Sequence, residues 1–134
     1  MQIDGACHCG YITYQARVDP ALASMCHCTD CQKLGGGALR TALPTPESQF
    51  ALLKGEPKVY VKTAENGNKR QQVFCPECGT HLYATTVGGE NRTLNLRIGT
   101  ARQRDEIPPQ RQVWFRSKQD WIMKLSQIPH KLKQ

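Results

Sequence analysis

The sequence contains no long hydrophobic run. No window approaches the roughly 20 consecutive apolar residues that a membrane-spanning helix needs, and residues 1–10 lack the basic and apolar regions of a secretory signal peptide. These absences predict a cytoplasmic protein without a membrane partner. The chain also lacks internal repeats and low-complexity linkers, so we expect its 134 residues to form one domain.

Apolar residues other than cysteine are scarce. The apolar fraction of 39% includes seven cysteines, and without them about a third of the chain is left to build a core. Disulfides are rare in a reducing compartment, and an odd number of cysteines leaves one unpaired in any case. The sequence therefore favours metal ligation over a disulfide framework, and we expect something besides apolar burial to stabilise the fold.

Acidic side chains are the minority among the charged residues. Eighteen Lys and Arg residues against eleven Asp and Glu residues give a formal charge of +7. This balance favours anionic partners, either small acidic substrates or nucleic-acid phosphates. Nucleic acid is the less favoured of the two, because the basic residues, including Lys124, Lys131 and Lys133, are dispersed and few aromatic residues lie among them.

Alternation of apolar and polar residues is the main sign of secondary structure. In residues 11–18 the apolar positions are Ile12, Tyr14, Ala16 and Val18, which is the pattern of a half-buried strand. A helical period is visible only weakly, in residues 118–125. Further strands are expected at residues 38–43, 50–53, 58–62, 70–74, 81–86, 93–98 and 112–116. The predicted fold class is mainly β and antiparallel.

Two turns join predicted strands into hairpins. The segment Lys54-Gly55-Glu56-Pro57 separates residues 50–53 from residues 58–62, where Val59 and Val61 alternate with polar positions. Asn66-Gly67-Asn68 tolerates positive φ and is expected to turn residues 58–62 back into residues 70–74.

The cysteines fall into three groups. A Cys-x-x-Cys step in a tight turn that ends in glycine lets two sulfurs converge on one ion while backbone amides point at them, which is typical of zinc. An iron–sulfur cluster is the alternative metal group. The groups are Cys7-His8-Cys9, Cys26-His27-Cys28-Thr29-Asp30-Cys31 and Cys75-Pro76-Glu77-Cys78, the last followed by Gly79.

Coordination number suggests how the cysteines divide. A closed structural zinc site takes four protein ligands, whereas a catalytic zinc keeps one position open. The pair Cys75 and Cys78 needs a second pair, so we assign it with Cys7 and Cys9 to a structural ion. Cys26, Cys28 and Cys31 then form a three-sulfur site with a vacant position. His27 or His8 as a fourth ligand at that position is an alternative. A residue between two ligands of a Cys-x-Cys step, however, usually points away from the metal.

Several segments together resemble a known family. They are Gly5-Ala6-Cys7-His8-Cys9-Gly10, Cys26-His27-Cys28-x-x-Cys31-Gln32-Lys33-x-Gly35, Lys54-Gly55-Glu56-Pro57, Phe74-Cys75-Pro76-Glu77-Cys78-Gly79-Thr80 and Ser117-Lys118-x-x-Trp121. In order and spacing they resemble the glutathione-dependent formaldehyde-activating enzyme (GFA) family, which includes a domain of centromere protein V. The resemblance runs from about residue 2 to about residue 129, which predicts a single GFA-type domain at 2–129 and a short tail at 130–134.

The resemblance implies a β-tent-like fold with two zinc ions. It implies a structural zinc on Cys7, Cys9, Cys75 and Cys78, and a catalytic zinc on Cys26, Cys28 and Cys31. The implied activity is that of a carbon–sulfur lyase acting in reverse, the condensation of glutathione with formaldehyde to S-hydroxymethylglutathione. With both sites filled, seven thiolates and two zinc ions would lower the formal charge to about +4.

One position departs from the family pattern. The tail motif usually carries a histidine where this chain has Gln112, and the loss of an imidazole there could remove a proton relay or a substrate contact. The fold inference survives this change, whereas the inference of the namesake substrate is weakened.

An open three-cysteine zinc site predicts activation of a thiol rather than of water, because three thiolates leave the ion little Lewis acidity. Asp30 is expected to favour the turn between ligands. Candidate cations for an anionic thiol are Lys33, Arg40, Arg97, Arg116 and Lys118. Trp114, Phe115 and Trp121 could form the wall of a pocket or pack in the core, and His81, His130 and Tyr83 are nominal general bases.

The principal alternative to an enzyme is a non-catalytic zinc domain that serves in folding or interaction, since fold does not fix function. A zinc-ribbon-like nucleic-acid binder is the third possibility.

Overall fold

The computed structural model describes all 134 residues, which form ten strands, one α-helix and several short 3₁₀ segments. The strands are β1 (Gln2–Ala6), β2 (Thr13–Arg17), β3 (Ser24–Cys26), β4 (Arg40–Pro46), β5 (Phe50–Lys54), β6 (Lys58–Thr63), β7 (Lys69–Phe74), β8 (His81–Thr86), β9 (Thr93–Leu96) and β10 (Arg111–Val113). The α-helix is α1 (Thr29–Gly35), and the 3₁₀ segments are η1 (Pro20–Leu22), η2 (Glu47–Gln49), η3 (Ile98–Thr100), η4 (Arg104–Glu106), η5 (Phe115–Ser117) and η6 (Asp120–Gln127).

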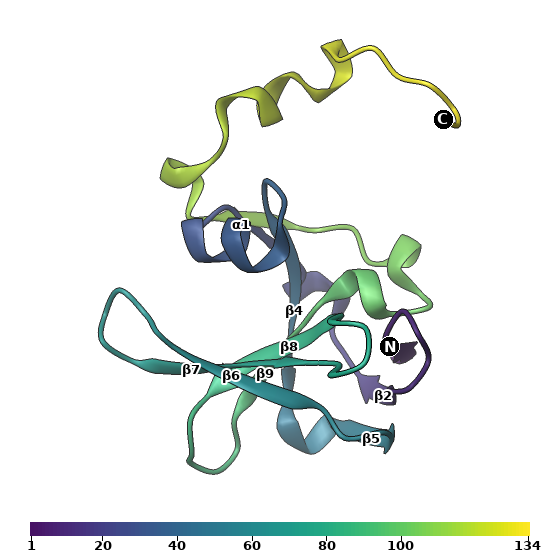
Figure 1. Cartoon of the computed structure of the whole chain (residues 1–134), viewed down its shortest axis with the longest axis vertical. Coiled ribbons are helices and arrows are strands. Elements are labelled where there is room, and N and C mark those ends of the chain that lie inside the picture. Colours follow the sequence, from purple (N-terminus) through teal and green to yellow (C-terminus); the bar gives the residue numbers. More distant parts are fainter.

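The strands form two sheets (Figure 1). One has three strands in the order β1-β2-β5, and the other has seven in the order β10-β3-β4-β9-β8-β7-β6. The predicted mainly β class is confirmed. All pairings are antiparallel except that of β10 with β3, which is parallel; the long stretch of chain between these two strands supplies the crossover that a parallel pair requires.

The core lies between the two sheets. The apolar positions predicted for residues 11–18, namely Ile12, Tyr14, Ala16 and Val18, are all buried, which confirms the alternation. The ring of Phe50 on β5 packs against Tyr14 on β2 and Tyr83 on β8, with ring centroids 5.3 Å apart in each case. Because β2 and β8 belong to different sheets, this aromatic group joins the sheets face to face.

One predicted hairpin is confirmed and the other is wrong. Strand β6 pairs with β7 through the turn at residues 66–68, as expected. Strand β5 instead pairs with β2, so the segment from Lys54 to Pro57 carries the chain from one sheet to the other. The close packing of Phe50 on Tyr14 supports this pairing, and Gly55, at φ +85, lies against the Tyr11 carbonyl where a Cβ would meet it at 2.5 Å.

Strand β6 is the exposed edge of the larger sheet. Val59 and Val61, predicted to form its half-buried face, are 44% and 45% exposed. Its polar Lys62 is instead the more buried residue, because it reaches inward to Asp30 of α1. The predicted alternation of β6 was therefore correct, but the side of the strand predicted to be buried was wrong.

Three elements carry too little sequence signal to be predicted. Strand β1 contains Asp4 and Gly5, β3 has only three residues, and α1 has seven, which is too short to show a helical period. Strand β4 begins at Arg40 rather than at residue 38, and β9 ends at Leu96, with Leu94, Leu96 and Ile98 buried as predicted.

The C-terminal segment extends away from the sheets (yellow in Figure 1). The helix expected at residues 118–125 is the 3₁₀ segment η6, which is broken at Lys124. The strand expected at 112–116 is β10 followed by η5, with Trp114 between them in the left-handed conformation at φ 54. None of the helices combines the length and the apolar character that crossing a membrane requires.

Candidate metal centre and adjoining cavities

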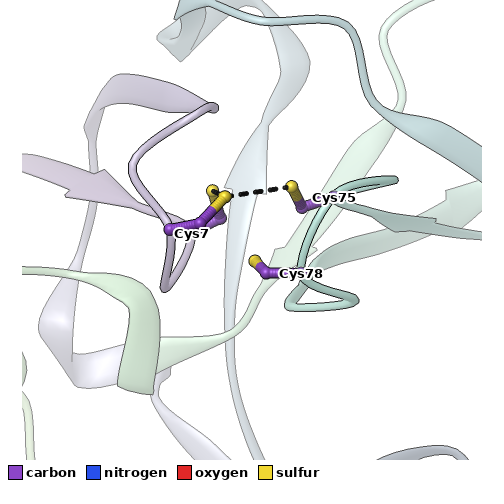
Figure 2. A group of neighbouring side chains, drawn as sticks. Cys7, Cys75 and Cys78 are labelled. Carbon is purple, nitrogen blue, oxygen red and sulfur yellow. Dashed lines mark hydrogen bonds between the residues drawn. The ribbon is translucent and has the colours of Figure 1, made fainter.

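Four cysteines converge where the β1–β2 turn meets the β7–β8 turn. The sulfurs of Cys7, Cys9, Cys75 and Cys78 all lie within 4.8 Å of one another. Figure 2 shows the sulfurs of Cys75 and Cys78 facing Cys7 from the opposite loop. Cys7 and Cys75 are buried and form one end of the core, whereas Cys9 and Cys78 face solvent. The cluster therefore joins residues more than 60 positions apart in the chain.

Backbone and hydroxyl groups hold these two turns in place. The Ile12 amide donates to the Cys7 sulfur at 3.2 Å, as expected for amides that point at ligating sulfurs. Gly79, at φ +76, closes the knuckle by donating its amide to the Cys75 carbonyl. The Thr80 hydroxyl lies 3.2 Å from the Cys78 sulfur, accepts a hydrogen bond from the His8 amide, and holds the pKa of the Cys78 thiol at about 5.

The other three cysteines converge at the junction of β3 and α1. Cys26 ends β3, Cys28 is the N-cap of α1, and Cys31 lies buried in its first turn. Their sulfurs also lie within 4.8 Å of one another, and the Cys31 amide donates to the Cys28 sulfur at 3.2 Å. A Cys-x-Cys-x-x-Cys sequence can place three sulfurs together because the strand gives way to a helix at its middle cysteine.

No histidine belongs to either group of sulfurs. The ring of His27 is fully buried, and its Nε2 lies 2.7 Å from the amide oxygen of Gln112 on β10. Phe115 lies edge-on to the same ring, with centroids 5.7 Å apart. Gln112, the residue that departs from the family pattern, therefore faces His27 and a shallow surface hollow rather than the cysteine site.

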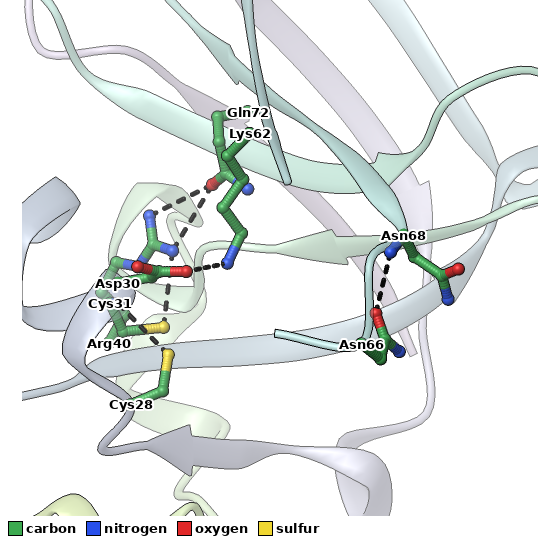
Figure 3. Close-up of polar contacts among 8 residues, drawn as sticks. All are labelled: Cys28, Asp30, Cys31, Arg40, Lys62, Asn66, Asn68 and Gln72. Atoms are coloured by element: carbon green, nitrogen blue, oxygen red, sulfur yellow. Dashed lines mark hydrogen bonds and ion pairs between the residues drawn. The ribbon is translucent and has the colours of Figure 1, made fainter. Parts of the chain in front are cut away.

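Arg40 connects the three-cysteine group to the larger sheet. Its guanidinium lies 3.4 Å from the Cys31 sulfur and 3.4 and 3.5 Å from the Gln72 amide oxygen (Figure 3). It also lies 3.3 Å from His81 Nδ1. The hydrogen bond with Cys26 and the Arg40 charge lower the pKa of the Cys31 thiol to about 5, while the same pairing raises the pKa of Cys26. The Arg40 charge therefore favours the ionised form of the Cys31 thiol.

An inner cavity of about 250 Å³ lies beside Cys26 and Cys31. Its lining contains four cationic side chains and no carboxylate, the cations being Arg40, Lys62, Arg70 and Arg97. Burial, together with the Arg40 charge, lowers the pKa of the Arg97 guanidinium to about 10, and burial lowers that of Arg70. The cavity is therefore a cationic space next to the sulfurs.

An outer groove of about 750 Å³ adjoins the same cysteines on the side of Cys28. It shares Lys62, Arg70 and Trp114 with the inner cavity, so the two spaces meet at these residues. The rest of its lining is polar and includes Asn66, Asn68, Thr86 and Arg116. The three-cysteine group thus lies where a small charged cavity opens into a larger polar groove.

The structure separates the candidate residues that the sequence grouped together. Arg40, Arg97, Arg116 and Trp114 line the two spaces, whereas Lys33 and Trp121 line a separate hollow beside α1. Lys118 lies over the Phe115 ring and pairs with Asp120. Among the nominal bases only His81 approaches the site, through Arg40; Tyr83 packs on Phe50, and His130 lies in the exposed tail.

Asp30 does more than favour the turn between the cysteines. It lies in the first turn of α1, where its charge suits the helix dipole, and it pairs with Lys62 of β6 at 2.6 Å. This ion pair fixes the edge strand against the helix that carries Cys31 (Figure 3).

Lys62, Arg70 and Gln72 are site residues that the sequence argument missed. Lys62 and Arg70 are directly opposed in the β6–β7 ladder, and Arg70 and Gln72 share a face of β7 because side chains alternate along a strand. The available signal was the run of polar residues on one face of this hairpin, to which the sequence argument assigned no role.

The fold and the two cysteine groups define a mainly β protein with two clusters able to hold metal ions. The model of the family described as glutathione-dependent formaldehyde-activating enzyme, GFA, matches residues 2–117. The chain belongs to this family. The matched residues end before Trp121, so the domain boundary at residue 129 stays a prediction.

Comparison with solved structures supports the fold. The crystal structure of a Rhodobacter sphaeroides protein from a structural genomics programme superposes with a TM-score of 0.61 and 17% sequence identity. The alignment covers 82% of this chain and 99% of the other. No curated protein matches the sequence.

Proposed function

We propose that this protein is a zinc-dependent enzyme of the carbon–sulfur lyase type, which activates a thiol such as glutathione for addition to formaldehyde or another small aldehyde. Cys26, Cys28 and Cys31 would hold the catalytic zinc. The other four cysteines, Cys7, Cys9, Cys75 and Cys78, would hold a structural zinc. Membership in the GFA family supports this reaction class.

The donor atoms suit zinc. Four sulfurs about 2.3 Å from one ion in tetrahedral geometry lie about 3.8 Å apart. The Cys7 and Cys9 sulfurs are 3.6 Å apart, and those of Cys9 and Cys75 are 3.9 Å apart. An iron–sulfur cluster places several atoms between its thiolates, so these separations fit a single ion better.

A zinc ion held by three thiolates would supply a fourth position at which a thiol loses its proton near neutral pH. Arg40 donates to the Cys31 sulfur and so holds this ligand in place. The Arg40 and Arg97 guanidinium groups line the inner cavity, where they can stabilise the negative charge that develops on a carbonyl oxygen under attack. Trp114 and Arg116 line the outer groove, which is large enough for the body of a peptide-like thiol.

One observation carries this proposal. The three-cysteine group lacks a fourth protein ligand and lies at the junction of two solvent-accessible spaces, whereas the four-cysteine group is complete. Gln112, which stands where the family usually has histidine, lines neither space.

A panel of thiols tests the proposal. The zinc-loaded chain, with cobalt replacing the labile ion, is titrated with glutathione, cysteine and 2-mercaptoethanol while the cobalt–thiolate absorption is followed. We expect at least one thiol to change the spectrum and to add to formaldehyde faster in the presence of the protein. If no thiol changes the spectrum, the three-cysteine site is not a thiol site, and the non-catalytic zinc domain becomes the better interpretation.

A further inference from the structure

The inner cavity holds more positive charge than its surroundings neutralise. Lys62 pairs with Asp30, but Arg40, Arg70 and Arg97 form no ion pair with any carboxylate. The Nε atoms of Arg40 and Arg97 are buried without a hydrogen-bond partner. A buried N–H donor without a partner is costly, and no carboxylate offsets the charge of these three groups, so they mark a place suited to an anionic ligand.

The proposed zinc site and its thiolates do not neutralise all of the positive charge in the inner cavity. The three guanidinium groups of Arg40, Arg70 and Arg97, none of which has a carboxylate partner, carry three positive charges. A zinc ion with three thiolates carries one negative charge, and the thiolate of a substrate adds a second. One positive charge in the inner cavity is still left, and formaldehyde, which is uncharged, cannot neutralise it.

The size of the cavity restricts the source of the missing anion. Its volume of about 250 Å³ lies below the roughly 300 Å³ at which sites for drug-sized ligands begin, whereas the outer groove, at about 750 Å³, lies well within that range. The body of a tripeptide thiol therefore fits the outer groove. The inner cavity is the smaller of the two spaces and lies beside the sulfurs of Cys26 and Cys31, so it suits the smaller reactant.

We propose that the inner cavity binds a small carbonyl compound that carries its own carboxylate, a 2-oxo acid of the glyoxylate type, as the partner of the thiol. The inference rests on the proposed function. Arg97 and Arg70 bind the carboxylate through charge-assisted hydrogen bonds, which places the carbonyl carbon toward Cys26 and Cys31. Arg is suited to this role because its planar fork matches a carboxylate.

The reaction of such a substrate balances without a further reagent. The thiol sulfur forms a bond to the carbonyl carbon as the carbonyl π bond breaks. Its electron pair moves to the oxygen, and that oxygen takes the proton that the thiol lost. The carboxylate is unchanged and no group leaves, so the product is a 2-hydroxy acid with a thioether at the same carbon.

Calorimetric titration of the zinc-loaded chain tests the binding. Glyoxylate is compared with glycolaldehyde, a neutral aldehyde of similar size, and the Arg97→Gln variant is compared with Arg102→Gln. Arg102 is 80% exposed, pairs with Asp4 and lines neither space, so it is the matched control. We expect glyoxylate to bind, glycolaldehyde to bind at least tenfold more weakly, and Arg97→Gln alone to weaken glyoxylate binding tenfold or more. Equal binding of the two aldehydes, or equal effects of the two variants, overturns the proposal.

A competition distinguishes a separate 2-oxo acid from a carboxylate of the thiol itself. If the inner cavity is reserved for the carbonyl partner, glyoxylate still binds in the presence of saturating glutathione. Loss of glyoxylate binding under those conditions, with glutathione binding weakened by Arg97→Gln, assigns the cavity to glutathione and overturns the inference. Thermal melting of each variant confirms that it is folded.

Turnover separates this inference from the proposed function. Preferential addition of a thiol to glyoxylate, lost in Arg97→Gln, supports both. Equal rates with glyoxylate and formaldehyde contradict the inference and leave the thiol chemistry standing. Tight glyoxylate binding without any thiol addition contradicts the proposed function and leaves the carboxylate site standing.

Discussion

Arg40 is the residue through which the three-cysteine group is coupled to the rest of the fold. It contacts Cys31 on α1, Gln72 on β7 and His81 on β8, so one guanidinium spans a helix and two strands. A charged group with this many neighbours is held in one orientation, which a site for a charged intermediate requires. The same charge also affects the titration of the neighbouring histidine.

The pH dependence of stability tests that effect. Burial and the charges of Arg40 and Arg97 lower the pKa of His81 below its usual value of about 6.5. The unfolded chain therefore binds a proton at His81 before the folded chain does. Stability is fully present above about pH 6.5 and falls as the pH drops from there toward the lower folded-state value.

We expect the His81→Gln variant to lack the pH-dependent part of the stability that comes from the lowered pKa of His81. Urea unfolding of zinc-loaded wild type and variant should show a difference in midpoint that changes between pH 7 and pH 5, with the wild type losing more stability. Proton-driven loss of zinc affects both proteins and cancels in the comparison. A difference that is constant with pH would contradict the lowered pKa.

Gln112 is a structural partner of His27. It is the hydrogen-bond partner of the buried ring, whose other nitrogen, Nδ1, already lacks one. Gln112→Leu leaves both ring nitrogens unpaired, and an unsatisfied buried polar group costs about 1–3 kcal/mol. We expect a loss of about that size in the free energy of unfolding measured with urea.

Gln110→Leu is the control, because Gln110 is exposed and its side chain bonds only to the nearby Pro108 carbonyl. Equal losses would show that His27 does not depend on Gln112.

At the scale of elements, β1 and β2 must approach closely for the four-cysteine group to form. Gly5 of β1 lies opposite Tyr14 of β2, and an added Cβ would meet the Tyr14 ring at 2.3 Å and the Thr100 carbonyl at 2.6 Å. The tyrosine is fully buried and bonded to Thr100, so it cannot move away at low cost.

Gly5→Ala is therefore expected to be destabilising. Overpacking of this kind costs about 1–3 kcal/mol, and the contact with backbone places this case at the upper end. Thermal unfolding should show a clear drop in Tm. Gly37→Ala, where an added Cβ meets no atom within 4 Å, should leave the Tm almost unchanged. A Gly5→Ala variant with the wild-type Tm would rule out the close β1–β2 packing.

The two cysteine groups have different relations to the elements they join. The four-cysteine group links the β1–β2 turn to the β7–β8 turn and lies at the end of the core, whereas the three-cysteine group lies within residues 26–31. Loss of the four-cysteine group breaks a connection between distant parts of the chain. Loss of the three-cysteine group leaves only a local segment without its ion.

We expect Cys78→Ser to unfold the protein and Cys28→Ser to leave it folded, with one zinc fewer. Structural zinc contributes an apparent binding energy of about 10 kcal/mol or more in small domains, which is comparable to the whole stability of an ordinary domain of this size. Circular dichroism with metal analysis of the purified variants checks both outcomes. Equal damage from the two substitutions would contradict the division of roles.

At the scale of the whole molecule, positive charge is concentrated rather than spread. Four of the basic residues surround one small cavity, although the sequence showed only a dispersed excess. The folded chain brings them together from β4, β6, β7 and the segment after β9, so an anionic ligand meets a local field stronger than the net charge of +7 suggests.

Metal content is the corresponding whole-molecule prediction. We expect close to two zinc ions per chain, one of which a chelator removes readily while the fold persists. The labile ion should belong to the three-cysteine group, because that group has fewer ligands and opens into two solvent-accessible spaces. Mass spectrometry under native conditions, before and after treatment with a chelator, measures both ions. A single, tightly held ion would contradict the open site.

Features that are encoded in local patterns could be predicted from the amino-acid sequence. The alternation at residues 11–18, the β6–β7 turn and the division of the cysteines into four and three followed from side-chain period, turn chemistry and coordination number, and the structure agrees with each grouping. These features depend on residues that are close together in the chain, or on the coordination number of a metal ion.

Three features could not be predicted without the folded structure: the pairing of β5 with β2, the exposure of Val59 and Val61, and the proximity of Lys62, Arg70 and Arg97 to Cys31. Each of these depends on which distant segment packs against a strand, and a polar residue on an alternating strand has the same signature whether it meets solvent or a buried cavity. The cysteines could therefore be found in the sequence, whereas the cationic cavity beside them, which determines what the site can bind, could be found only in the fold.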